Sequence, residues 1–396
     1  MVIREKYLEL LRAYREKRLI KVVSGIRRCG KSTLLEMFQR ELLAGGLETR
    51  QIISLNFEDM AFRNLLTADT LYDHIEKRIA DAKMNYIFLD EIQMVADFER
   101  VANSLFIKKN VDLYITGSNA YFLSSELATL LTGRYIEIKM LPFSFKEYVS
   151  AFPQPLDLQQ AYEKYVEFGS FPQSVELYRE NPALVSKYLQ SVYDTVIYKD
   201  IVARKNIKNT MILQDVTKFL FDNIGNVTAS KRIADYLTAH QRKTSYHTVE
   251  SYISALADSF VIYPLNRFDI KGKTILQTLK KYYVVDMAFR RLLSDASPAD
   301  YGNVLENVIF LELIRRYDKV WIGKNRDSEI DFVVKDTDGY IYFQVALTVR
   351  DEKTKKRELA AFGVRDNYKK ILLTMDPEEG SIDGILQRNA LKWLLE

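Results

Sequence analysis

Two glycines, a lysine and a serine stand at a fixed spacing near the start of the chain, where residues 25–32 read GIRRCGKS. Glycines let a backbone wrap closely around a bound group, and the free N–H groups at the start of a helix attract an anion. A lysine followed by a hydroxyl at this spacing is typical of a loop that holds nucleotide phosphates. The apolar run 19–24 before it and the helical pattern 33–38 after it supply the strand and the helix that such a loop requires.

Each side chain of this loop has an expected part in binding. We expect Lys31 to reach the β- and γ-phosphates and the Ser32 hydroxyl to bind Mg²⁺. A position between two cations at a helix start also favours the thiolate form of the single cysteine, Cys29. The predicted nucleotide contacts are Gly25, Ile26, Arg27, Arg28, Cys29, Gly30, Lys31, Ser32 and Thr33.

A second stretch, 86–91, reads YIFLDE, four apolar residues followed by two carboxylates. The apolar run predicts a strand that is buried on both faces in a parallel sheet. At its end, Asp90 is expected to hold Mg²⁺, directly or through water, and Glu91 to polarise an attacking water as general base.

Polar side chains also end the neighbouring predicted strands. Ligands collect at the carboxyl ends of strands in an open parallel sheet, so Glu58, at the polar end of the predicted strand 51–59, either faces the nucleotide or caps a loop. Strand 111–116 ends in Thr116, and there Asn119 or Ser118 is predicted to sense the γ-phosphate. Arg134 is a candidate for stabilising phosphoryl-transfer charge, in cis or toward a neighbouring subunit, with a surface ion pair as the alternative.

Five motifs appear in order along the chain, at 25–32, 89–93, 116–120, 132–135 and 141–148. Together they resemble the prokaryotic AAA-type ATPases that carry a conserved C-terminal domain of unknown function. The resemblance implies an α/β fold whose P-loop NTPase core has a parallel sheet of order 5-1-4-3-2. It also implies binding of ATP and Mg²⁺ and hydrolysis of ATP, and it leaves the biological task open.

The rest of the chain is predicted to form three further parts. Residues 1–142 are assigned to the ATPase core, 143–208 to a helical lid, 209–299 to a winged-helix-like domain and 300–396 to a PD-(D/E)xK nuclease-like, restriction-endonuclease-like α/β domain. The winged helix-turn-helix assignment rests on three helical patterns followed by two strands, and it predicts contact either with duplex DNA or with a protein. Its expected basic rim comprises Arg242, Lys271, Lys273, Lys280 and Lys281.

The nuclease-like assignment depends on three positions. Glu306 lies on an apolar helix, Asp331 on one strand of a predicted hairpin and Gln344 on the other. Metal-dependent cleavage needs two carboxylates for Mg²⁺ and a lysine. Here the segment 344–346 reads QVA, so an amide replaces one carboxylate and the lysine is missing. We therefore predict a degenerate, inactive nuclease site.

The bulk composition bounds these interpretations. A chain of 396 residues with 47% hydrophobic and 28% charged residues describes a globular protein of two or three domains. The net charge of +4 does not by itself establish a nucleic-acid partner. One cysteine excludes an intramolecular disulfide and favours the cytoplasm, and no apolar run is long enough to predict a membrane span.

Three functions remain open at this stage. The first is a Mg²⁺-dependent ATPase that acts as a nucleotide-controlled switch on DNA or on a protein partner. The second is a DNA-binding or nuclease protein that ATP regulates, and the third is a signalling scaffold that recruits partners. The oligomeric state is left open.

Overall fold

The computed structural model describes residues 2–80, 83–118, 131, 133–294, 300–325, 328–364 and 366–396, without the side chains of 277 and 278. The chain divides into two compact units, Met1–Pro142 with Asp258–Phe260, and Phe143–Ala257 with Val261–Glu396. The first division falls at the predicted end of the ATPase core. The further division near 208 stays a prediction.

A five-stranded sheet of order β2-β3-β4-β1-β5 forms the centre of the first unit. All four pairings between neighbouring strands are parallel, so the predicted order 5-1-4-3-2 is confirmed. The strands are β1 (Ile20–Ser24), β2 (Ile52–Asn56), β3 (Asn85–Asp90), β4 (Val111–Gly117) and β5 (Tyr135–Lys139).

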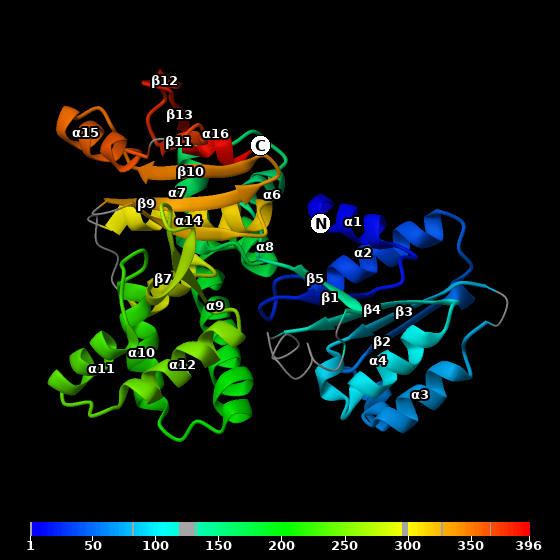
Figure 1. Ribbon diagram of the computed structural model, residues 1–396. Coiled ribbons are helices and arrows are strands. Elements are labelled where there is room, and N and C mark those ends of the chain that lie inside the picture. The colour runs from blue at the N-terminus through cyan, green and yellow to red at the C-terminus, as the bar shows by residue number, and fades with distance from the viewer. Residues whose placement is uncertain are drawn as a thin grey trace. The chain divides into compact units, whose positions relative to one another are not determined.

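Helices cover both faces of this sheet (Figure 1), with α1 and α2 on one face and α3 and α4 on the other. On the α2 face, Phe38 packs against Phe88 and Tyr114. On the other face, apolar side chains of α3 and α4 join those of the strands in one buried cluster. The helices are α1 (Glu5–Tyr14), α2 (Lys31–Ala44), α3 (Ala68–Glu76) and α4 (Phe98–Ile107), with short 3-10 turns η1 (Thr49–Gln51), η2 (Met60–Leu65) and η3 (Ile92–Met94).

The second unit begins with helices. Those in the predicted lid are α6 (Phe145–Ser150), α7 (Leu158–Phe168), α8 (Pro172–Glu180), the 3-10 turn η5 (Pro182–Leu184), α9 (Val185–Asp194) and the π-helix η6 (Thr195–Ala203). Three helices and a hairpin follow, as the sequence pattern predicted: α10 (Thr210–Asp222), α11 (Ser230–Ala239), α12 (Tyr246–Asp258), β6 (Ile262–Asp269) and β7 (Thr274–Val284).

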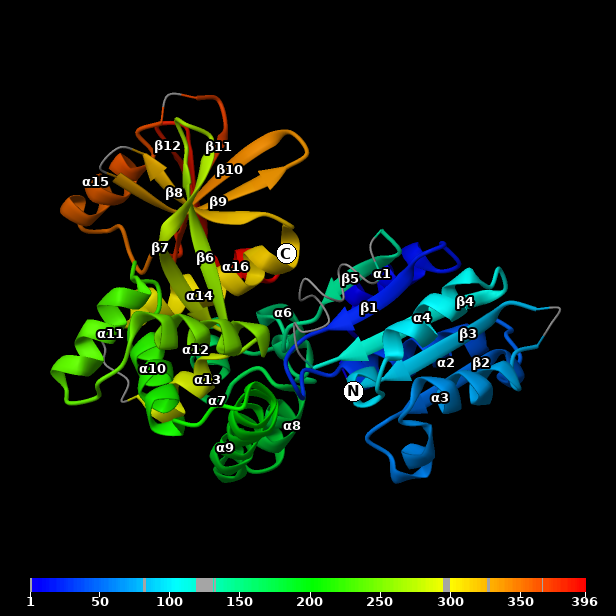
Figure 2. The same ribbon diagram turned by 60° about the horizontal axis from the view of Figure 1, so that its bottom comes forward.

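This hairpin belongs to a larger sheet. An eight-stranded sheet of order β12-β13-β11-β10-β9-β8-β6-β7 includes it, because β6 pairs in parallel with β8. Figure 2 shows β6 and β7 reaching from beside α12 to the strands of the C-terminal part. The predicted boundary at 299 therefore cuts through one continuous sheet, and an isolated wing does not form.

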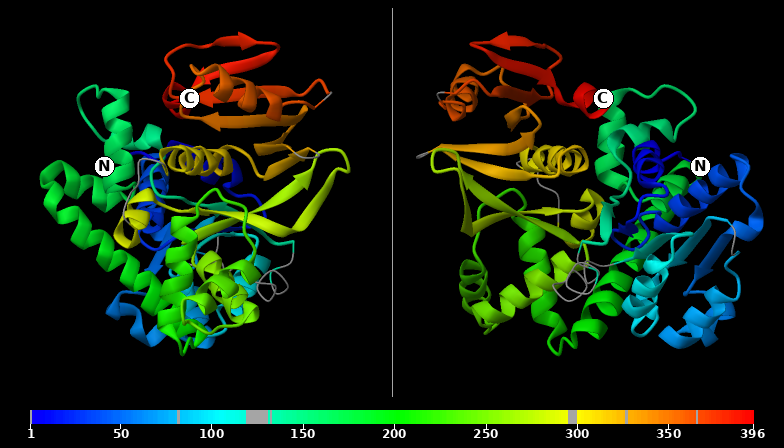
Figure 3. Two further views of the ribbon diagram at one scale, coloured as in Figure 1. Left: turned by 90° about the vertical axis from the view of Figure 1, so that its left-hand side faces the viewer. Right: turned by 45° about the vertical axis from the view of Figure 1, so that its right-hand side comes forward.

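The remaining elements complete the second unit. Helix α14 lies along the sheet and contacts β7, β9 and β10 (Figure 3). The remaining elements of the second unit are α13 (Met287–Leu293), α14 (Tyr301–Arg316), β8 (Val320–Asn325), β9 (Ser328–Asp336), β10 (Gly339–Ala346), α15 (Glu352–Ala361), β11 (Lys369–Thr374), β12 (Gly380–Ile382), β13 (Ile385–Asn389) and α16 (Ala390–Leu394).

Candidate active site

The loop between β1 and α2 has a backbone that its glycines make possible. Gly25 has φ 155°, and a Cβ atom at this position would stand 2.1 Å from the carbonyl oxygen of Met140. Gly30, at the start of α2, has φ 102°, a left-handed conformation that costs glycine little. The loop thus turns sharply into the N-terminal end of α2, where free backbone N–H groups favour an anion.

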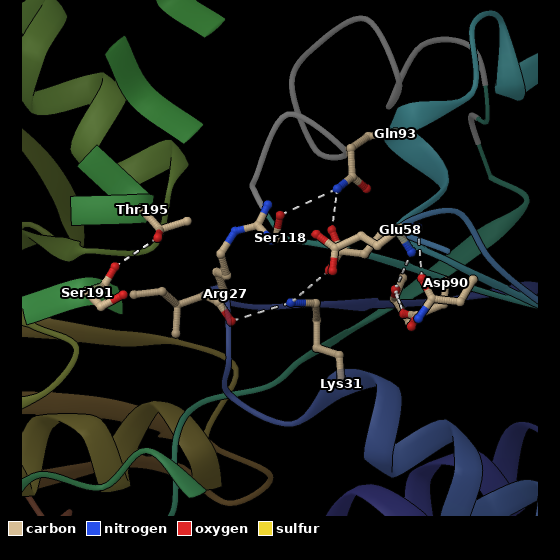
Figure 4. A network of polar contacts seen from close by, with 12 residues as sticks. Arg27, Lys31, Glu58, Asp90, Gln93, Ser118, Ser191 and Thr195 are labelled. Carbon is tan, nitrogen blue, oxygen red and sulfur yellow. Dashed lines mark hydrogen bonds and ion pairs between the residues drawn. The ribbon is translucent and has the colours of Figure 1, made fainter. Parts of the chain in front are cut away.

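Lys31 lies inside this loop and is only 4% exposed. Its ammonium donates hydrogen bonds to the backbone carbonyls of Gly25, at 3.1 Å, and Ile26, at 3.4 Å. The same nitrogen lies 3.6 Å from a carboxylate oxygen of Glu91 (Figure 4). The loop and the end of β3 therefore share one buried cation.

Asp90, the last residue of β3, is held by two hydroxyls. The Thr116 hydroxyl, from β4, donates a hydrogen bond to Oδ1 of Asp90. Burial raises the pKa of Asp90, and hydrogen bonds from Ser32 and Thr116 oppose that shift. The arrangement joins Ser32 to Asp90, the pair predicted to hold Mg²⁺.

Glu91 has a strained backbone, with φ 53°. Its backbone N–H donates to the Thr116 hydroxyl oxygen at 2.9 Å, and its carboxylate accepts a hydrogen bond from the Gln93 amide. Burial alone would raise the pKa of Glu91, but Lys31, the Gln93 hydrogen bond and Arg27 together lower it. Glu91 is thus ionised at neutral pH, as a general base must be.

The Gln93 amide also lies 3.4 Å from the Ser118 hydroxyl. Gln93 was not predicted as a site residue, although its place two residues after Glu91 was a signal for it. Glu58 makes an ion pair with Arg27 at 2.7 Å, which brings both of these residues to the same end of the sheet.

Of the other predicted site residues, one lies outside the described residues and one lies elsewhere on the sheet. Asn119 lies outside the described residues. Arg134 lies at the opposite end of the sheet, because its carbonyl accepts a hydrogen bond from the N–H of Ile20, the first residue of β1. Its guanidinium donates to the side chain of Asn103 at 2.7 Å and lies over the Phe106 ring. Five strand residues at roughly 3.3 Å each separate that end from the loop, so a role in cis is not supported.

The prediction that Cys29 is a thiolate is wrong. The side chain is fully buried, and burial raises the pKa of the Cys29 thiol despite the nearby charges of Lys31 and Arg4. A buried thiol in this position is neutral at pH 7 and fills space under the loop.

A second polar site lies in the other unit, where Glu306, Asp331 and Gln344 come close together as predicted. The backbone N–H of Asp331 donates to the side-chain Oε1 of Gln344 at 3.2 Å, and the side-chain amide N–H of Gln344 donates to Glu358 at 2.8 Å. Both ends of the Gln344 side chain are therefore used within the protein.

Lys281 is the unexpected member of this second site. Its ammonium lies 3.0 Å from Glu306, 3.0 Å from Glu329 and 3.7 Å from Asp331. Two expectations are corrected by it: Lys281 is 4% exposed and does not join a basic rim, and the nuclease-like arrangement does contain a lysine. The lysine comes from β7, in the hairpin that joins this sheet.

The charges of the second site compensate each other. Burial alone would lower the pKa of Lys281, but Glu306, Asp331 and Glu329 together raise it. Burial and the charge of Glu306 raise the pKa of Asp331 to about 8.

Across the described residues, no group of three or more His, Cys, Asp or Glu side chains is arranged to hold a metal ion. A Mg²⁺ ion bound together with a nucleotide needs fewer, because phosphate oxygens and water complete its shell.

The comparisons with known proteins agree with this geometry. Residues 17–149 match the family model described as "AAA domain", and residues 159–300 match a domain of unknown function (DUF8612). An uncharacterized protein of Haemophilus influenzae is 37% identical over 401 residues, covering 100% of this chain and 99% of that protein. The chain belongs to the same family as that protein, and its first unit contains an AAA domain with the P-loop fold.

Two more distant relatives extend the comparison. An uncharacterized protein of Methanocaldococcus jannaschii is 28% identical over 357 residues, covering 87% of this chain and 78% of that protein. The solved structure of a Walker-type ATPase of Pyrococcus abyssi has a TM-score of 0.52 and 16% identity, over 74% of this chain and 96% of that one. The second likeness shows a shared fold. In the described parts of this AAA-type chain, no helix has the length and apolarity needed to span a membrane.

Proposed function

We propose that the protein is a Mg²⁺-dependent ATPase whose nucleotide state controls the action of its second unit on DNA or on a protein partner. The observation that carries the proposal is the convergence of Lys31, Ser32, Asp90 and Glu91 at the carboxyl ends of β1 and β3. A phosphate-binding backbone, a cation, a hydroxyl–carboxylate pair and an ionised carboxylate are the parts that phosphoryl transfer to water requires.

The chain's own groups fit this chemistry. The loop N–H groups and Lys31 would bind the phosphates, and Ser32 and Asp90 would hold Mg²⁺, which neutralises phosphate charge. Lys31 is held by two loop carbonyls and lies beside Glu91, so turning toward a phosphate would release Glu91 to accept a proton from water. Thr116 would keep Asp90 and Glu91 in place through its two hydrogen bonds.

The test separates binding from turnover. Lys31→Ala is expected to abolish tight ATP binding, and Glu91→Gln to retain binding while turnover falls about 10²- to 10⁴-fold, the usual contribution of a general base. Binding would be measured with a fluorescent ATP analogue and turnover as phosphate released. Lys109→Ala and Glu36→Gln change exposed side chains of the same unit and serve as matched controls.

The switch is tested by the same measurements with and without duplex DNA. A change in turnover of the wild-type protein that Glu91→Gln abolishes would link the two units. If turnover does not respond to duplex DNA, the DNA branch of this proposal is contradicted. A wild-type protein that neither binds nor hydrolyses ATP would contradict the proposal as a whole.

A further inference from the structure

A pocket of about 950 Å³ lies on the eight-stranded sheet of the second unit, and Lys281, Glu306, Glu329 and Asp331 are not among its lining residues. The turn after β6, the start of β10 and the loop after α15 line it. Its floor is solid, because Phe268, Ile270 and Tyr342 belong to a buried apolar cluster of this sheet. The pocket is thus a surface feature above a packed core.

Two tyrosine rings form a corner in the pocket. Tyr340 and Tyr368 are half-buried, their ring centroids lie 5.4 Å apart, and the ring planes meet at 79°. A flat ring can lie against one of these faces while its edge meets the other, which is the geometry in which aromatic groups attract each other.

The position of the Tyr368 ring is set by its surroundings. Gly339 has φ 128°, and a Cβ atom there would stand 2.5 Å from the Tyr368 ring, so the ring packs directly against the backbone. Asp366 accepts hydrogen bonds from the Tyr342 hydroxyl at 2.7 Å and from the Tyr368 backbone N–H at 3.3 Å. The corner is therefore held in place before any ligand binds.

The rim of the pocket is basic and carries amides. Lys271 and Lys273 are exposed, and among the described residues no carboxylate lies within ion-pair distance of either ammonium. Among the described residues that line the pocket, Asp366 alone carries a carboxylate, and Tyr342 and Tyr368 donate hydrogen bonds to it. Asn325 and Asn367 add groups that can both donate and accept hydrogen bonds.

We propose that this pocket binds a single-stranded nucleic acid, with an unstacked base against Tyr340 and Tyr368 and the backbone phosphates at Lys271 and Lys273. Aromatic rings beside a positive rim are the combination that such strands require, because every base has a face to stack. Bases inside a duplex are already stacked and cannot reach the corner. The proposal deepens the DNA branch of the proposed function and rests on it.

The test uses the full chain and a fluorescein-labelled oligothymidylate of about 15 nucleotides, within the usual site size of such grooves. Binding is followed by fluorescence anisotropy over a range of salt concentrations. Lys271→Glu/Lys273→Glu should weaken binding and reduce the slope of log K against log salt by about 1.4, two contacts at about 0.7 each for a single strand. Tyr368→Ala should weaken binding by about 5-fold to 150-fold through lost stacking.

Matched variants separate this site from general effects. Lys353→Glu/Lys356→Glu makes the same charge change on exposed residues of α15, outside the pocket lining, and should bind like the wild type. Tyr368→Phe keeps the ring and should also bind like the wild type. Thermal unfolding of each variant checks that the fold is retained.

The inference is overturned if the lysine variant binds as the wild type does, if the control pair loses as much affinity, or if duplex DNA binds more tightly than the single strand. ATP binding is measured in the same samples. Protein that binds ATP but no oligonucleotide contradicts only this inference, and protein that binds the oligonucleotide but no ATP contradicts only the ATPase proposal.

Discussion

Lys31 in the first unit and Lys281 in the second are both buried next to carboxylates, and they differ in what surrounds them. Lys31 is held by two backbone carbonyls and lies 3.6 Å from one carboxylate, Glu91. Lys281 lies among three carboxylates, at 3.0 Å, 3.0 Å and 3.7 Å. The residue types are alike in the two sites. In the first site, backbone N–H groups of the loop are available to a bound anion. In the second site, the Lys281 ammonium already balances the charge of the carboxylates.

A buried lysine beside carboxylates is therefore not sufficient to identify an active site, because the surrounding groups decide whether a ligand can bind. At the first site, a glycine loop, a helix start and two hydroxyls surround the charges, so an anion and a divalent ion can replace the internal contacts. At the second, removing the internal cation would leave buried carboxylates unpaired, which is expensive. We therefore expect substitutions at the first site to change chemistry and those at the second to change stability.

The largest effect is expected for Lys281→Ala. Loss of this cation leaves Glu306, Glu329 and Asp331 without their shared partner and should lower the free energy of unfolding by about 3–5 kcal/mol. Urea unfolding followed by circular dichroism measures it. Lys31→Ala is the comparison and should lose less stability while losing ATP binding; equal losses would contradict the distinction between the sites.

A pH dependence of stability is expected from Asp331 of the second site. The pKa of Asp331 is about 8 in the fold, raised by burial and by Glu306 from an unfolded value near 3.8, so the folded state binds the extra proton between these values. Its contribution to stability is present below about pH 4 and is lost as the pH rises toward 8. Asp331→Asn removes this proton, so the stability of the variant relative to the wild type should increase with pH, by at most about 1.4 kcal/mol per unit. A difference that stays constant across this range would contradict the assignment.

A smaller effect, on turnover, is expected for Thr116→Val. The variant keeps the shape of the side chain but loses the hydroxyl that contacts Asp90 and the backbone of Glu91. Hydrogen bonds to charged groups are worth about 1.5–3 kcal/mol, so ATP turnover should fall roughly 10-fold to 150-fold with ATP binding retained. Thr70→Val, on α3, is the control, and unchanged turnover in Thr116→Val would remove Thr116 from the site.

The smallest effect is expected for Arg134→Ala. This side chain contacts Asn103 and Phe106 at the far end of the sheet, so its loss should cost about 0.5–1 kcal/mol of stability. Turnover measured in dilute protein should stay within about twofold of the wild type if Arg134 has no part in cis. A larger loss that appears only at high protein concentration would support the predicted role toward a neighbouring subunit.

The candidate site illustrates how far the sequence could be read. The phosphate loop and the Asp90–Glu91 pair are each a continuous stretch of sequence. The apolar run before each motif predicted a strand that ends there, and the structure has strands β1 and β3 at these places. Cys29 was misjudged because its neighbours in sequence are cations, whereas its burial depends on packing from other elements. Lys281 was misjudged for the same reason, since its position in β7 gave no sign of which side chains β9 and α14 would bring to it.

From the sequence alone, spacing and apolar pattern within short stretches predicted the phosphate loop at 25–32 and the carboxylate pair at 90–91, and the resemblance to AAA-type ATPases implied the α/β fold and the strand order of the first sheet. Only the tertiary structure decided which distant groups meet. Lys281 and Glu306 are 25 positions apart, and the pairing of β6 with β8 and the packing of α14 bring them to 3.0 Å. Strand register and helix packing of this kind arise from the fold as a whole. Lys281 lies on β7, in the predicted winged-helix-like domain, yet it contacts carboxylates of the predicted nuclease-like domain.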